Sequence, residues 1–140
     1  ALRSGFCRAT CMILDSHVEP LKRSWCLFET FQSLILKDED ETFQGLLFCT
    51  SAGVLNYGAQ AYDVAMGIAG ELSTLRVEDA NASLIADKEM IDSLVREYPG
   101  GFANVNSFVA GCIRGALHQT RSQFENDFRA LDQLLRQRSA

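Results

Sequence analysis

The stretch from Cys11 to Leu36 constrains the fold more than any other part of the chain. A short apolar run, residues 11–14, stops at Asp15, and a polar turn with Pro20 follows. Apolar residues then recur at helical spacing, at Leu21, Trp25, Phe28, Phe31 and Ile35. This order predicts a buried strand over residues 9–15, then a turn and an amphipathic helix. Because the run lacks polar alternation, we expect the strand to be apolar on both faces, as in a parallel sheet covered by helices.

The start of this helix has two interpretations. Pro20 suits the first turn of a helix, where its missing N–H would have no partner in any case. Ser24 suits the N-cap position, if the regular helix begins later. The sequence leaves both open.

The middle of the chain repeats the alternation of strands and helices. We expect an acidic connection over residues 38–41, which is either a solvated loop or a cation site, and then a strand over residues 46–49. A helix over residues 59–72 and a short third strand over residues 74–78 follow. The next helix has its apolar face at Leu84, Ile91, Leu94, Val95 and Tyr98 and ends at Pro99-Gly100-Gly101.

This alternation predicts an α/β fold, with a three-stranded parallel sheet flanked by helices and a long C-terminal helix. No residues precede the first strand that could form its neighbour, so we expect one edge of the sheet to be open. Either a longer precursor supplies the missing strands, or a protein partner covers that edge.

Residues 102–138 predict a last helix that is longer than the body of so small a domain. Its final turns should project or fold back, so we divide the chain into a domain of residues 1–117 and a helical extension of residues 118–140. Gly111 and Gly115 mark a close helix approach or a bend, and we favour the close approach. The extension carries an apolar series suited to docking on a partner helix or groove: Phe124, Phe128, Leu131 and Leu135.

Composition limits the function classes. The net charge of −5 and pI near 5.0 argue against nucleic-acid binding, which needs clustered Lys and Arg. Five cysteines without a CxxC pair favour a reducing, intracellular compartment, either the cytoplasm or an organelle interior. No apolar run reaches the length of a membrane span. Two histidines and scattered cysteines show no metal-ligand spacing.

The segment around Trp25 resembles a known family. An apolar strand, a short polar loop and Ser24-x-Cys26 around Trp25, with Leu27 and Glu29 opening a helix, is similar to the third strand and following helix of Toll/interleukin receptor (TIR) domains. ILD, PLKRSWCLFE and ASLIAD resemble a TIR-like domain of algal and other protist proteins over residues 1–117. The resemblance implies a five-stranded flavodoxin-like fold, of which this chain would hold strands three to five.

The motif itself has two interpretations. In the structural one, Trp25 and Phe28 anchor the helix in the core, Cys26 fills a small gap, and Glu29 is a boundary carboxylate. In the other, the resemblance places the catalytic glutamate of NAD-cleaving TIR domains on Glu29. NAD would then be a substrate and not a cofactor, and the carboxylate would stabilise the positive charge that develops on the ribose.

Two functions of different class follow. The favoured one is a non-catalytic interaction or scaffold module within a larger assembly, binding through Trp25, Cys26 and the apolar series of the extension. It rests on the truncated sheet, the acidic composition and the heptad-like end. The alternative is an NAD glycohydrolase that uses Glu29, which the absence of the first two family strands from this chain disfavours.

Overall fold

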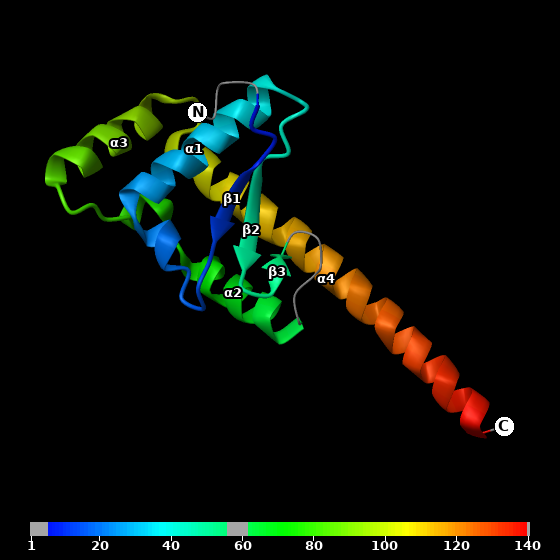
Figure 1. Ribbon diagram of the computed structural model, residues 1–140. Helices are drawn as coiled ribbons and strands as arrows, with labels where there is room; N and C mark the ends of the chain where they lie inside the picture. The colour runs from blue at the N-terminus through cyan, green and yellow to red at the C-terminus, as the bar shows by residue number, and fades with distance from the viewer. Residues whose placement is uncertain (1–5, 56–61, 140) are drawn as a thin grey trace.

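The structure, a computed structural model, describes residues 6–55 and 62–139. The elements with described bounds are a small sheet, four α-helices and two 3-10 helices (Figure 1). The elements in chain order are β1 (Thr10–Ile13), η2 (Glu19–Lys22), α1 (Ser24–Glu39), β2 (Leu46–Thr50), β3 (Gly53–Val54), α2 (Tyr62–Thr74), η4 (Val77–Asp79), α3 (Ile85–Glu97) and α4 (Gly101–Ser139).

The sheet has the order β1-β2-β3 and is mixed, not purely parallel as the sequence predicts. β1 and β2 are parallel, joined by the α1 crossover, with Thr10 opposite Leu46. β3 returns antiparallel to β2 through a tight turn. The predicted third strand over residues 74–78 is wrong. Thr74 ends α2, and Val77 is buried as the first residue of η4.

The sheet buries one face among the described residues. Met12 and Phe48 lie opposite each other on the covered face, where α1 and α4 contact β2 and the core lies. On the other face Cys11 is exposed and Ile13 is 73% exposed. The expectation that the first strand is apolar and buried on both faces is therefore wrong: its residues alternate between core and surface. The predicted open edge is present, because β1 pairs with β2 alone in the described part of the chain.

The structure corrects both interpretations of the start of α1. Pro20 lies in the first turn of η2. The regular helix then begins at Ser24, with Arg23 in extended conformation at the N-cap position and no side chain capping it. The Ser24 N–H donates to the carbonyl of Asn81 at 2.8 Å, so the segment after η4 supplies a partner for one of the N–H groups that the helix itself leaves unpaired.

α3 and the part of α2 that the structure describes follow the predicted helices, while residues 59–61 lie outside the described residues. On α3, Ile91 and Val95 are fully buried, whereas Leu84 just before it and Leu94 stay exposed. Gly100 and Gly101, both at positive φ, turn the chain from α3 into α4. A Cβ at Gly100 would lie 2.8 Å from that of Asn104, so this turn requires glycine.

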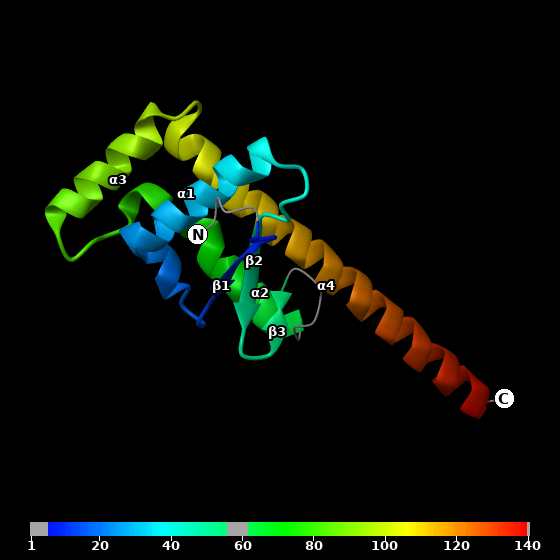
Figure 2. The same ribbon diagram turned by 45° about the horizontal axis from the view of Figure 1, so that its top comes forward.

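α4 is one uninterrupted helix, about 58 Å long at ~1.5 Å per residue. Its first half packs on the body through Val105, Val109 and Ile113, beside α2. Its second half projects into solvent, so of the two expectations the helix projects and does not fold back (Figures 1 and 2). The close approach expected at Gly111 and Gly115 is absent: a Cβ at either position would meet no atom of the described residues within 4 Å.

Candidate functional site

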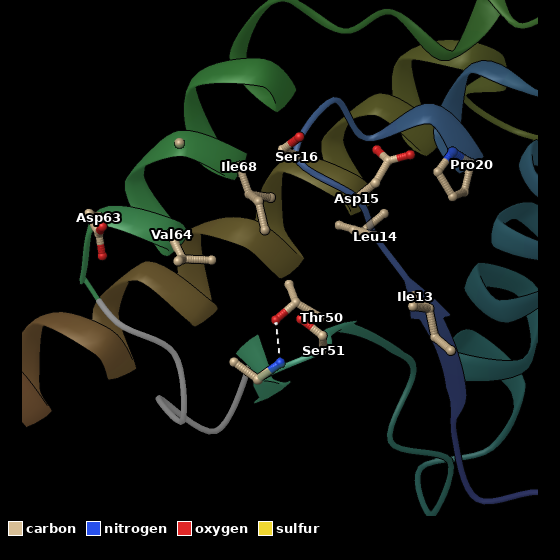
Figure 3. Close-up of a pocket in the computed structure, with 12 residues that line it drawn as sticks. Ile13, Leu14, Asp15, Ser16, Pro20, Thr50, Ser51, Asp63, Val64 and Ile68 are labelled. Carbon is tan, nitrogen blue, oxygen red and sulfur yellow. Dashed lines mark hydrogen bonds between the residues drawn. The ribbon is translucent and has the colours of Figure 1, made fainter.

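A pocket of about 790 Å³ opens where β1 and β2 end. In α/β sheets, ligands bind in the crevice outside the carboxyl ends of parallel strands. The described lining comes from the turn after β1, the turn after β2 and the first turns of α2 (Figure 3). It consists of Ile13, Leu14, Asp15, Ser16, Pro20, Thr50, Ser51, Ala52, Asp63, Val64, Gly67 and Ile68.

Asp15 shapes the turn on one side of this pocket. Its Oδ1 accepts the backbone N–H groups of His17 at 3.0 Å and Glu19 at 3.1 Å. These bonds, chiefly the one from Glu19, hold the pKa of Asp15 below its usual value. Val18, within the same turn, is fully buried in the left-handed region at φ 51°, a strained conformation for a β-branched residue. The carboxylate is thus engaged in holding the turn.

The described lining of the pocket offers binding groups but no acid–base pair. Asp15 and Asp63 are the ionisable residues of its described lining, and they lie on opposite sides of it (Figure 3). The Thr50 hydroxyl accepts the Ala52 N–H at 3.2 Å. A nucleophile and a base would have to lie within hydrogen-bond reach of each other. The arrangement suits a ligand with an apolar body and a few hydroxyl groups. Sequence reasoning did not predict this pocket, although Asp15 ends the first of two strands predicted to be parallel and Thr50 directly follows the second.

Trp25 lies at the surface and not in the core. It is 48% exposed, and its indole N–H donates to Asp87 Oδ2 at 3.1 Å. Phe28, half-buried, meets the indole edge-to-face with ring centroids 5.9 Å apart. Trp25 therefore ties the start of α1 to the start of α3, which corrects the expectation that it anchors α1 in the core.

Cys26 and Glu29 lie on α1, apart from the pocket at the strand ends. Cys26 is half-buried against the core, and its pKa is raised, mainly by burial and then by the negative charge of Glu29. Glu29 is exposed. Neither residue belongs to the described lining of the pocket, so the structure does not bring the predicted catalytic glutamate together with it.

The second half of α4 carries a continuous apolar surface. Ile113, Ala116 and Thr120 are buried against the body, and the same helix face continues into the extension. There it holds five large apolar side chains, which we call the distal stripe: Phe124 (52% exposed), Phe128 (63%), Leu131 (60%), Leu134 (58%) and Leu135 (62%). Four of these are the predicted series, and Leu134 widens it at one border. The heptad spacing of the four predicted residues is the sequence feature that indicates this surface.

The distal stripe begins beside the N-terminal end of α2, where the contact between α2 and α4 stops. Tyr62, the first described residue of α2, packs its ring on Phe124 with centroids 5.3 Å apart. A depression of about 270 Å³ follows between Phe124 and Phe128, bounded by Glu125 and Arg129. Beyond it the described residues leave the stripe uncovered. The stripe thus continues the interface between α2 and α4 past the end of the body.

Comparison of the chain with protein-family models, curated proteins and solved structures finds no match in any of the three. The described residues include no group of three or more His, Cys, Asp or Glu side chains that could hold a metal ion. Among the described helices, none has the length and apolar composition to cross a membrane.

Proposed function

We propose that this chain is a non-catalytic protein-interaction module that docks a helix of a partner protein on the distal stripe of α4. The exposure of the stripe carries the proposal: five large apolar side chains lie in one row, each more than half exposed. Contiguous exposed apolar surface of this kind marks interaction sites. An amphipathic helix is the partner that such a row fits, through anchors at heptad spacing.

The TIR-like relationship remains part of this proposal. The parallel β1-α1-β2 unit, with Trp25 and Glu29 on the first turns of α1, supports it. The antiparallel β3 departs from the parallel sheet that the relationship implies. The described contacts of Glu29 do not favour NAD cleavage as the function. Its carboxylate is exposed and does not belong to the described lining of the pocket.

A helical peptide tests the docking proposal. The probe is a four-heptad peptide with Leu at both seam positions and Gln at the flanking ones, labelled for fluorescence anisotropy. We expect it to bind the full chain and to slow amide hydrogen exchange in residues 124–135. The double variant Phe128→Asp, Leu131→Asp should lose binding, because it places two charges in the apolar contact.

The matched control places the same charges on the opposite face of α4, by Asn126→Asp and Gln133→Asp. This variant should bind the peptide like the unmodified chain. If the peptide fails to bind, or if both double variants bind equally, the distal stripe is not a docking surface and the proposal is wrong.

A further inference from the structure

Three carboxylates border the distal stripe. Glu125 and Asp132 flank it on one side and Asp127 on the other, at the helix positions next to the apolar seam. Arg129 and Arg136 lie one position farther round the helix, where Arg129 borders the depression beside Glu125. Apart from Leu134, the positions that directly flank the apolar seam are therefore acidic.

Each bordering carboxylate already has a contact within α4 that uses one of its oxygens. Arg121 reaches Glu125 Oε1 at 2.9 Å, and Arg136 reaches Asp132 Oδ2 at 2.8 Å. The amide of Gln123 donates to Asp127 Oδ1 at 3.0 Å. All are exposed i,i+4 contacts, which are weak and exchangeable. The second oxygen of each group remains for a cation on a docked helix.

A second copy of this chain fits the stripe poorly in the antiparallel orientation. Aligning Phe124 with Leu135 of the other copy places Arg121 opposite Arg138 in the same seam. It also places Glu125 beside Asp132 at the flanking positions. By symmetry each like-charge contact occurs twice, and such contacts oppose association.

The parallel orientation of a second copy also brings like charges together. In register, Arg121 would face its own copy across the seam. Asp127 would lie beside Asp132 of the other copy on both sides. Each orientation thus brings like charges together at a seam position and at a flanking position.

We infer that the occupant of the distal stripe is a helix of a different protein, with an apolar seam flanked by Lys and Arg. This inference rests on the proposed docking function and adds the charge of the partner to it. A basic flank places a cation against each of Glu125, Asp127 and Asp132, whereas a second copy places a carboxylate against two of the three in either orientation. Complementary charge of this kind sets partner choice more than affinity.

Two peptides that differ only in flanking charge test the inference. Both have four heptads with Leu at the seam, and one carries Lys and the other Glu at the flanking positions. At low ionic strength we expect the full chain to bind the Lys peptide about tenfold more tightly than the Glu peptide. The ratio should shrink at high salt, because exposed charges are screened.

Two triple variants locate the effect. Glu125→Gln, Asp127→Asn, Asp132→Asn should reduce the ratio of the two affinities to about one. Glu39→Gln, Glu89→Gln, Glu97→Gln removes the same net charge from exposed positions of α1 and α3, and should keep the ratio. Equal affinity for the Lys and Glu peptides, or a preference for Glu, overturns the inference.

The oligomeric state separates this inference from the function on which it rests. We expect the chain alone to sediment as a monomer. If the chain sediments as a dimer and the Phe128→Asp, Leu131→Asp variant sediments as a monomer, a second copy of the chain is the occupant. That outcome overturns the inference of a basic partner but leaves the docking function intact. Failure of every peptide, including the Gln-flanked one, would overturn both.

Discussion

Ser24, the first residue of α1, has a fully buried hydroxyl for which the described residues offer no hydrogen-bond partner. A buried polar group without a partner costs free energy that an apolar replacement recovers. We expect Ser24→Ala to raise the free energy of unfolding in urea by about 0.5–1 kcal/mol.

Ser33 is the control, since its Oγ lies 2.6 Å from Thr10 Oγ1 and 2.8 Å from the Glu29 carbonyl. Ser33→Ala should lower stability by about 1 kcal/mol. A loss of that size in Ser24→Ala would show that its hydroxyl is satisfied.

Glu78 links η4 to α4 and makes the fold sensitive to acid. The Asn106 amide donates to its Oε2 at 2.8 Å, and this bond is the main cause that lowers the pKa of Glu78 to about 2, with Arg76 adding to it. Since the folded pKa is depressed, the stabilisation is complete above the unfolded value, near 4.5, and is lost as the pH falls toward 2. Allowing for solvent screening, it amounts to about 1–2 kcal/mol.

The variant Glu78→Gln should lose this stabilisation at pH 7 and show a flatter decline of unfolding free energy between pH 5 and about pH 2. Glu89→Gln, at an exposed position on α3, should leave the decline unchanged. Urea titrations at a series of pH values measure both. An unchanged pH profile in Glu78→Gln would contradict the assigned role of the Asn106 contact.

At the scale of elements, Lys88 holds η4 against α3. Its ammonium group donates to the carbonyls of Ala80 at 2.6 Å and Glu78 at 3.2 Å, and lies 3.2 Å from Asp92 Oδ2. The Asp92 side chain is 8% exposed, so removing Lys88 leaves a buried charge with only the longer contact to Arg96. We expect Lys88→Met to cost about 2–3 kcal/mol of unfolding free energy in denaturant titrations.

Arg96 gives the comparison, because it approaches the same Asp92 oxygen at 3.7 Å from an exposed position. Arg96→Met should cost less than about 1 kcal/mol. The double change Lys88→Met, Asp92→Leu should recover part of the loss, since it removes both members of the pair. Equal losses in the two single variants would mean that burial of the pair is not the source of the stability.

The sequence predicted the long helices and the two apolar strands, and it missed the two-residue strand and the 3-10 turn for a physical reason. α1, α3 and α4 each span several turns, so their apolar period is visible. β3 spans two residues and shows no period, and it was missed. Residues 74–78 were predicted to form a strand, yet Val77 packs into the core from a 3-10 turn. The Val77 N–H donates to the side-chain oxygen of Asn106, a residue far along the chain. Contacts with residues distant in the sequence determine the conformation of residues 74–78, and such contacts leave no local pattern in the sequence.

At the scale of the molecule, the sequence could not tell which face of the sheet is covered. An apolar run such as Cys11 to Leu14 is the same whether helices lie on both faces or on one. The apolar series from Phe124 to Leu135 was readable because heptad spacing is local. The pocket at the strand ends was not, since it depends on how α2 returns to the turns after β1 and β2.

The body and the distal half of α4 should behave as separable parts. A chain that ends at Glu125 keeps the buried Thr120 and the ring contact between Tyr62 and Phe124. It should unfold in urea within about 0.5 kcal/mol of the full chain, while its circular dichroism loses helical signal. A chain that ends at Leu117 also loses Thr120 and Phe124, and should be weaker by about 1–2 kcal/mol. If ending at Glu125 already destabilised the body by more than about 2 kcal/mol, the distal stripe would be packed against the body and not free to dock a partner.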